Sequence, residues 1–127
     1  MKLQSDLSRV LGLGSARAGS HHWIHQRMTA IALIPLALWF VTALLTHMHD
    51  DMVDLTNWIR SPFVTVLLVS LIGAMFYHAK LGLQVVIEDY FHVEIVKVAL
   101  LIVMKLGCAF GALLGIVSVL KISFGMT

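Results

Sequence analysis

Three long apolar stretches, joined by short polar connections, restrict the fold of this chain more than any other feature. They run from about residue 28 to 45, from 63 to 87 and from 96 to 120. A helix needs roughly 20 mostly apolar residues to cross the hydrocarbon core of a bilayer, and backbone in lipid must satisfy its own hydrogen bonds. The stretches therefore predict an all-α membrane protein with three transmembrane helices.

The composition agrees with a protein whose surface faces lipid. Apolar residues make up 59% of the 127 residues and charged residues 13%, against roughly half and a quarter in soluble proteins. We expect a single membrane domain over residues 1–127, in which residues 1–27 precede the first helix and Pro35 bends that helix. The net charge of +2 does not suggest a nucleic-acid partner, and the single cysteine, Cys108, excludes an intrachain disulfide or a multi-cysteine metal site.

The distribution of charge predicts an orientation in the membrane. Four basic residues and one acid precede the first apolar stretch, whereas three acids and one arginine lie in the connection 47–62. Because basic residues favour the cytoplasmic side, we expect a cytoplasmic N-terminus and a periplasmic C-terminus in a bacterial inner membrane, or the equivalent sides of a mitochondrial inner membrane. Trp23 and Trp58 would then lie at opposite interfaces, and His47 and His49 would be solvated in the outer connection.

A histidine stands deep inside the second stretch. His78 is 12 residues from Tyr90, about 18 Å along a helix, which is a little past halfway through a hydrocarbon core of about 30 Å. A neutral imidazole there could ligate iron, carry protons or hydrogen-bond to another helix. Ala74 and Gly82, one turn to either side, leave a flat recess that suits either the face of a porphyrin or the close packing of a second helix.

The second stretch ends on a carboxylate and a phenol. Asp89 is 11 residues beyond His78, or about 1100° of helical rotation, so the two side chains share a face to within roughly 20°. A phenol such as Tyr90 can donate a hydrogen bond to a quinone carbonyl while a nearby carboxylate exchanges protons with water. Acids and tyrosines are also ordinary residues where a helix leaves the membrane, and both interpretations stay open at this point.

Four other polar residues need a role. Lys80 could extend toward the cytoplasm or pair with a buried acidic group. His21 and His25, at i and i+4, could hold a metal on a helix. Without a third ligand, however, placement at the membrane interface explains them better than a metal site does. Arg27, at the start of the first helix, could neutralise an anion held between helices.

These residues together resemble the small D-type membrane anchor subunit of succinate dehydrogenase. The shared pattern is His-Ala-x-x-Gly followed by Asp-Tyr, after a histidine and an arginine that precede the first of three helices, present here as His78-Ala79, Gly82, Asp89-Tyr90, His21 and Arg27. The segments HHWIHQRMTAIALIPLALWF and LGLQVVIEDY look especially like the alphaproteobacterial and mitochondrial-ancestor form. The resemblance covers nearly the whole chain.

The resemblance implies a specific function. Such a chain is half of a heterodimeric anchor bundle that it forms with a C-type anchor, and the two hold one haem b between them. His78 would be an axial iron ligand, Arg27 and His21 would lie near the haem propionates, and Tyr90 with Asp89 would bind ubiquinone. The iron–sulfur subunit and the flavoprotein subunit would dock on the cytoplasmic side.

The chain would therefore serve succinate:ubiquinone oxidoreductase, respiratory complex II, as a subunit without catalytic residues of its own. Succinate oxidation would belong to the flavoprotein, and electrons would reach quinone at this anchor. Two alternatives are the related anchor of a quinol:fumarate reductase and a purely structural membrane subunit in which His78 only joins two helices.

Overall fold

The computed structural model describes residues 17–125, with side chains from residue 21. Four helices make up this part of the chain: α2 (Arg17–His47), α3 (Met52–Arg60), α4 (Pro62–Tyr90) and α5 (Glu94–Ser123). The charged residues Lys2, Asp6 and Arg9, which contributed to the predicted orientation, lie outside the described residues.

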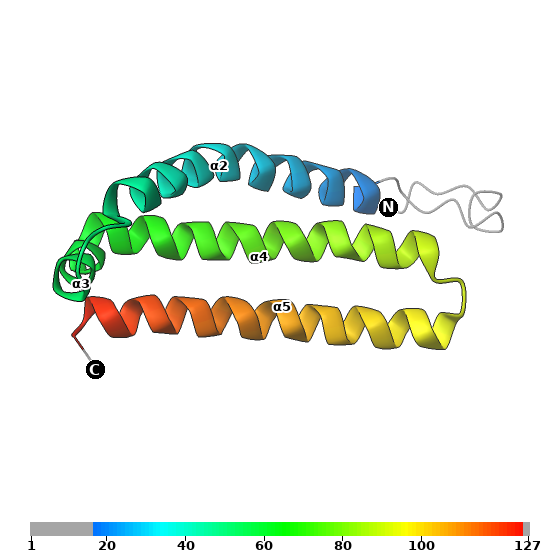
Figure 1. Ribbon diagram of the computed structural model, residues 1–127. Coiled ribbons are helices and arrows are strands. Elements are labelled where there is room, and N and C mark those ends of the chain that lie inside the picture. The colour runs from blue at the N-terminus through cyan, green and yellow to red at the C-terminus, as the bar shows by residue number, and fades with distance from the viewer. Residues whose placement is uncertain (1–16, 126–127) are drawn as a thin grey trace, which may run out of the picture.

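Each of the three predicted membrane-crossing stretches lies within one long helix. Each of α2, α4 and α5 is long and apolar enough to cross a membrane, so the predicted fold class is confirmed. Residues 17–27, expected to precede the first helix, belong to α2. Pro35 lies inside α2 without ending it, and the helix follows a bowed path in Figure 1, as expected where a proline removes one backbone hydrogen bond.

The long helices form a single layer with α4 in the middle. Figure 1 shows α2 and α5 on opposite sides of α4, and α4 makes the main helix–helix contacts with both. The start of α2 and the short α4–α5 connection lie at one end of the layer, whereas α3 and the end of α5 lie at the other. Trp23 and Trp58 therefore lie toward opposite ends, as the aromatic pattern predicts.

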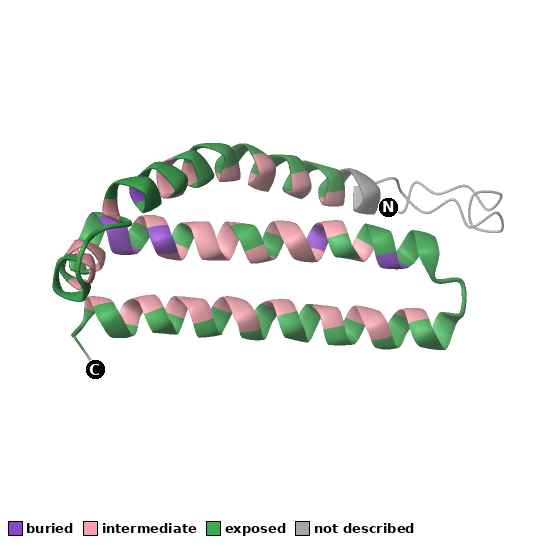
Figure 2. Ribbon diagram, in the orientation of Figure 1, coloured by how far each residue is buried: buried purple, intermediate pink, exposed green. Residues whose placement is uncertain are grey.

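A single layer buries little of its own surface. Ala43 of α2 and five residues of α4 are buried, and no residue of α3 or α5 is; Figure 2 shows this as a few purple turns in α2 and α4. In a bilayer, exposed apolar side chains can face lipid, but the arrangement also leaves both faces of the layer available to another membrane subunit.

Small residues let α5 approach α4 closely. A Cβ added at Gly111 would lie 2.7 Å from Cε1 of Phe76, and one added at Gly115 would lie 3.2 Å from Cγ2 of Ile72. These two glycines are one helical turn apart, on the face of α5 that meets α4. The contact is thus of the small-xxx-small type, in which helices in lipid gain stability from close van der Waals packing.

A short amphipathic helix, α3, forms most of the polar connection 47–62, for which the sequence predicts no membrane-crossing helix. Asp51 caps its start by accepting hydrogen bonds from the backbone N–H groups of Val53 and Asp54. Leu55, Trp58 and Ile59, at helical spacing, line one side of a cavity of about 330 Å³ against α2 and α4. Such a helix is suited to lie in the plane of the membrane interface.

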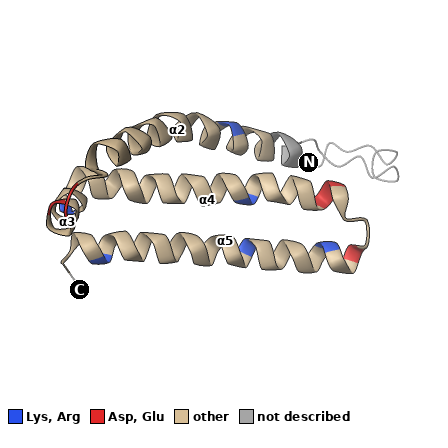
Figure 3. Cartoon of the chain, viewed as in Figure 1, with Lys and Arg blue, Asp and Glu red and all other residues tan. Residues whose placement is uncertain are grey.

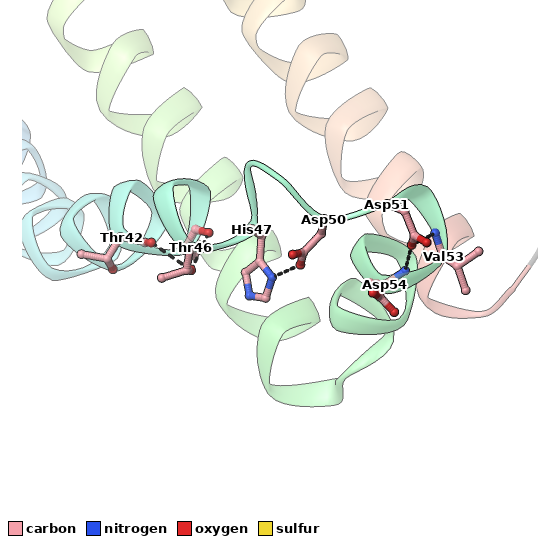
Figure 4. A network of polar contacts seen from close by, with 8 residues as sticks. Thr42, Thr46, His47, Asp50, Asp51, Val53 and Asp54 are labelled. Carbon is pink, nitrogen blue, oxygen red and sulfur yellow. Dashed lines mark hydrogen bonds and ion pairs between the residues drawn. The ribbon is translucent and has the colours of Figure 1, made fainter.

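The prediction that His47 is solvated in the outer connection is confirmed only in part, because 28% of its side-chain surface stays accessible. It is the last residue of α2, it is half-buried, and its Nδ1 hydrogen-bonds to the carboxylate of Asp50 (Figure 4). Its ring also lies 4.5 Å from that of Trp58, centroid to centroid. The fold of α3 back against α2 explains the difference, because it covers the end of a helix that the sequence left open. His49 is exposed, as expected.

Polar bonds between chain segments hold the α3 end of the layer together. Thr65 is buried, and its hydroxyl lies 2.9 Å from that of Ser123 on α5. Arg60 Nε donates to the carbonyl of Ile122, 3.4 Å away, in the last turn of α5. Figure 3 shows most other charged residues near the ends of the helices and in α3, while Lys80 and Lys105 lie in the bodies of α4 and α5. The charge pattern matches helices that cross lipid.

A glycine-to-alanine substitution tests the close α4–α5 contact. Gly111→Ala should destabilise the protein by roughly 1–3 kcal/mol, the usual cost of overpacking, because Phe76 must move. Gly107→Ala on the same helix is the control, since a Cβ there would meet nothing within 4 Å. Thermal unfolding in detergent would measure both. Equal stability of the two variants would contradict the packing described here.

Candidate functional site

His78 lies close to the middle of the central helix. Since α4 runs from Pro62 to Tyr90, its midpoint is residue 76, and His78 is about 3 Å beyond that point at 1.5 Å per residue. The imidazole is half-buried. An ionisable side chain at this depth is costly to leave facing lipid, and the layer places α2 directly beside it.

The partner of His78 is a threonine on α2. Thr29 Oγ1 lies 3.0 Å from Nδ1 of His78. The same hydroxyl oxygen lies 2.9 Å from the carbonyl oxygen of His25 and 3.0 Å from that of Gln26, in the preceding turn of α2. This arrangement connects two helices by one polar contact within an otherwise apolar part of the layer.

The other ring nitrogen of His78 stays available. Nε2 makes no hydrogen bond to any described residue. It is also not enclosed, since the only enclosed and unpaired side-chain nitrogen or oxygen among the half-buried and buried residues of 21–125 is Nε2 of His22. An imidazole held through Nδ1 with Nε2 open is the usual arrangement of a histidine that ligates a metal. Among the described residues, no group of three His, Cys, Asp or Glu side chains could form a metal site by itself.

The small residues around His78 divide between two faces of α4. Gly82 lies toward α2, because a Cβ there would meet the side-chain nitrogen of Gln26 at 3.7 Å. Gly73 lines a groove between α4 and α5. The helix-packing interpretation therefore applies at Gly82, where α2 covers the recess that the sequence suggested for a porphyrin.

Lys80 faces away from the His78–Thr29 contact. Its ammonium lies 5.2 Å from the centre of the Tyr77 ring, within the range of a cation–π interaction. It lines the same open groove between α4 and α5, of about 320 Å³, as Lys105 of α5. The two lysines thus lie at a similar depth in the layer, about 15 Å from the α4–α5 connection.

The two residues predicted near an anion lie apart from His78. The guanidinium of Arg27 lies 4.5 Å from the centre of the Trp23 ring, and Arg27 is turned about 160° around α2 from Thr29. His21 is exposed, and its ring stacks on that of His25 at 6.5 Å. The described contacts do not bring either residue to His78, so their roles stay predictions.

Asp89 and Tyr90 lie at the end of α4, both exposed. Tyr90 keeps 77% of its surface accessible, and Asp89 is also exposed. The preceding acid, Glu88, accepts a hydrogen bond from Gln84 one turn earlier, at 2.8 Å, whereas Asp89 accepts none from the described residues. A free carboxylate and a free phenol can therefore meet a molecule that approaches this end of the layer.

Sequence reasoning missed Thr29. This residue follows His22 and Gln26 at the helical spacing i, i+4, i+7; all three are partly buried, and Gln26 and Thr29 contact α4. That spacing marks one polar stripe on an apolar helix and was the available signal. It could not show which residue of α4 the stripe would meet.

These features define the class of the protein: a multi-pass membrane protein with polar residues at two depths of its central helix. The chain belongs to the family described as "Succinate dehydrogenase/Fumarate reductase transmembrane subunit", whose profile matches residues 1–116. The resemblance stated from the sequence is therefore confirmed at the level of the family. No solved structure matches the chain with significance.

Curated relatives carry consistent names. The "Succinate dehydrogenase hydrophobic membrane anchor subunit" of Rickettsia conorii is 35% identical over 106 residues, which cover 83% of this chain and 84% of that protein. The protein of the same name from Rickettsia bellii is 36% identical over 104 residues, 81% and 82% of the two chains. The "Succinate dehydrogenase membrane anchor subunit" of Reclinomonas americana is 31% identical over 91 residues, 68% and 74%.

Proposed function

We propose that this chain is a membrane anchor subunit of succinate:ubiquinone oxidoreductase that helps to bind haem b and ubiquinone. The family and the three membrane-crossing helices support the anchor role. The observation that carries the haem assignment is His78, near the middle of α4, with Nδ1 bonded to Thr29 and Nε2 open. The family description also includes fumarate reductase, so an anchor that works in the opposite direction is the second candidate.

The residues present fit one side of a haem site. His78 would hold the haem iron through Nε2, and a second chain would supply any further histidine ligand, because no second histidine of the described residues pairs with His78. When bound, the haem supplies a one-electron carrier within the membrane. Arg27 and His21 are proposed to hold its propionates by charge and hydrogen bonding.

Quinone binding is proposed for the end of α4. The phenol of Tyr90 would donate a hydrogen bond to a quinone carbonyl, and Asp89 would exchange protons with water. Reduction of a quinone to a quinol takes up two protons, so a carboxylate with access to solvent is useful beside the head group. Because both side chains are exposed, the rest of this site must come from partner subunits.

The layer of helices suggests how the partners assemble. A C-type anchor would cover one face of the layer, where α5 has no buried residue of its own, and lipid would cover the other. The iron–sulfur and flavoprotein subunits would dock at the end that holds Asp89 and Tyr90. We propose that this end faces the cytoplasm of a bacterium, or the matrix of a mitochondrion, as the basic residues indicate.

Replacement of His78 tests the haem assignment. In the purified complex, His78→Ala should abolish the reducible b-type absorbance, because one axial ligand is removed. His49→Ala, at the α3 end of the layer and exposed, is the control and should keep the full spectrum. An unchanged haem spectrum in His78→Ala would refute the assignment and favour a purely structural role for this residue.

Replacement of Tyr90 tests the quinone assignment. Tyr90→Phe should slow ubiquinone reduction by roughly fivefold to tenfold, the effect of losing a hydrogen bond worth about 1–1.5 kcal/mol. Succinate oxidation with a soluble artificial acceptor should be unchanged, because the flavoprotein is untouched. Tyr77→Phe, in the body of the same helix, is the matched control. If Tyr90→Phe reduces ubiquinone at the normal rate, Tyr90 does not belong to the site.

A further inference from the structure

The contact between Thr29 and His78 determines which ring nitrogen carries a proton. A threonine hydroxyl has one proton to donate and lone pairs to accept. Two backbone carbonyl oxygens, those of His25 and Gln26, lie 2.9 and 3.0 Å from Thr29 Oγ1 and can accept the hydrogen bond that this proton makes. With its proton directed there, the hydroxyl oxygen can accept a hydrogen bond from Nδ1–H of His78, at 3.0 Å.

This assignment leaves Nε2 of His78 as the nitrogen with the free lone pair. In a neutral imidazole only one nitrogen carries a proton, so a proton on Nδ1 makes Nε2 the metal-binding atom. Nε2 is also the ring nitrogen to which no described residue hydrogen-bonds and which none of them encloses. Proton position and access therefore select the same atom.

We infer that Thr29 is a positioning residue for His78, one that fixes the tautomer and orientation of the imidazole and increases the basicity of Nε2. The inference rests on the proposed role of His78 as a haem ligand. Acceptors for the N–H on the non-ligating nitrogen of a metal-bound histidine act in this way in many metal sites, and their removal lowers metal affinity by roughly 10–100-fold. Here the acceptor comes from a different helix, so the packing of α2 on α4 would set the properties of the ligand.

The other threonines of α2 with described contacts, Thr42 and Thr46, make no hydrogen bond to another helix. Thr42 donates to the carbonyls of Leu38 and Trp39, at 3.0 and 2.8 Å, and is exposed. Thr46 makes the same type of bond one turn later (Figure 4). Neither hydroxyl has a side-chain partner among the described residues. Thr42 is therefore a matched control for Thr29.

The test compares four forms of the assembled, purified complex: the unchanged chain, Thr29→Val, Thr29→Ser and Thr42→Val. The readouts are the haem content, the midpoint potential of the haem and the electron paramagnetic resonance spectrum of its ferric form. Thr29→Val should shift the potential to a more positive value, because a less basic imidazole stabilises ferric iron less. Thr29→Ser keeps the acceptor oxygen and should restore the original potential and spectrum, and Thr42→Val should change neither.

Two results would overturn the inference. One is an unchanged potential and ferric spectrum in Thr29→Val, and the other is an equal shift in Thr29→Ser. If Thr29→Val does not assemble, Thr29→Ala, which adds no bulk, takes its place in the comparison with Thr29→Ser.

The outcome is separable from that of the haem assignment itself. Loss of haem in His78→Ala together with an unchanged potential in Thr29→Val would contradict only the role of Thr29. Retention of haem in His78→Ala would contradict the proposed function, and with it the basis of the inference.

Discussion

The packing of α4 between α2 and α5 is the arrangement on which the rest of the structure depends. In lipid there is little hydrophobic force between helices, so close van der Waals contact and a few polar bonds must hold them together. On the α5 side, Gly111 and Gly115 let the backbone approach Phe76 and Ile72. On the α2 side, the Thr29–His78 contact joins the helices near mid-membrane. The central helix is thus held on the α5 side by close packing and by the Thr65–Ser123 contact at one end, and on the α2 side by a polar bond near its middle.

The same arrangement separates the polar residues of α4 by depth and by direction. His78 turns toward α2, whereas Lys80 turns toward α5 and lies in a groove with Lys105. Asp89 and Tyr90 lie at the helix end, exposed. The haem and quinone sites proposed at His78 and at the Asp89–Tyr90 pair would both need groups from other chains. A function shared with other subunits follows naturally from a layer that leaves its faces and one end open.

The limits of prediction from sequence are clearest for α3 and for His47. The connection 47–62 contains the nine-residue helix α3, which is too short and too polar to give a membrane-crossing signal. Its amphipathic spacing becomes meaningful only where it packs against α2 and α4. For His47, nothing in the sequence shows that Trp58 folds back on its ring and covers part of it. The sequence predicts an open recess at Gly82 beside His78, but it does not show that Gln26 of α2 covers this glycine.

The sequence by itself determined the number of membrane-crossing helices, the depth of His78 and the position of Asp89 and Tyr90 at a helix end. These properties follow from the length of apolar runs and from the fixed rise of a helix, which are local. Only the tertiary structure decided that α4 is central, that Thr29 meets His78 from 49 residues away, and that Lys80 and Lys105 share a groove. Those pairings depend on the register and rotation of one helix against another, which arise from the packing of side chains on both helices and which no single helix encodes.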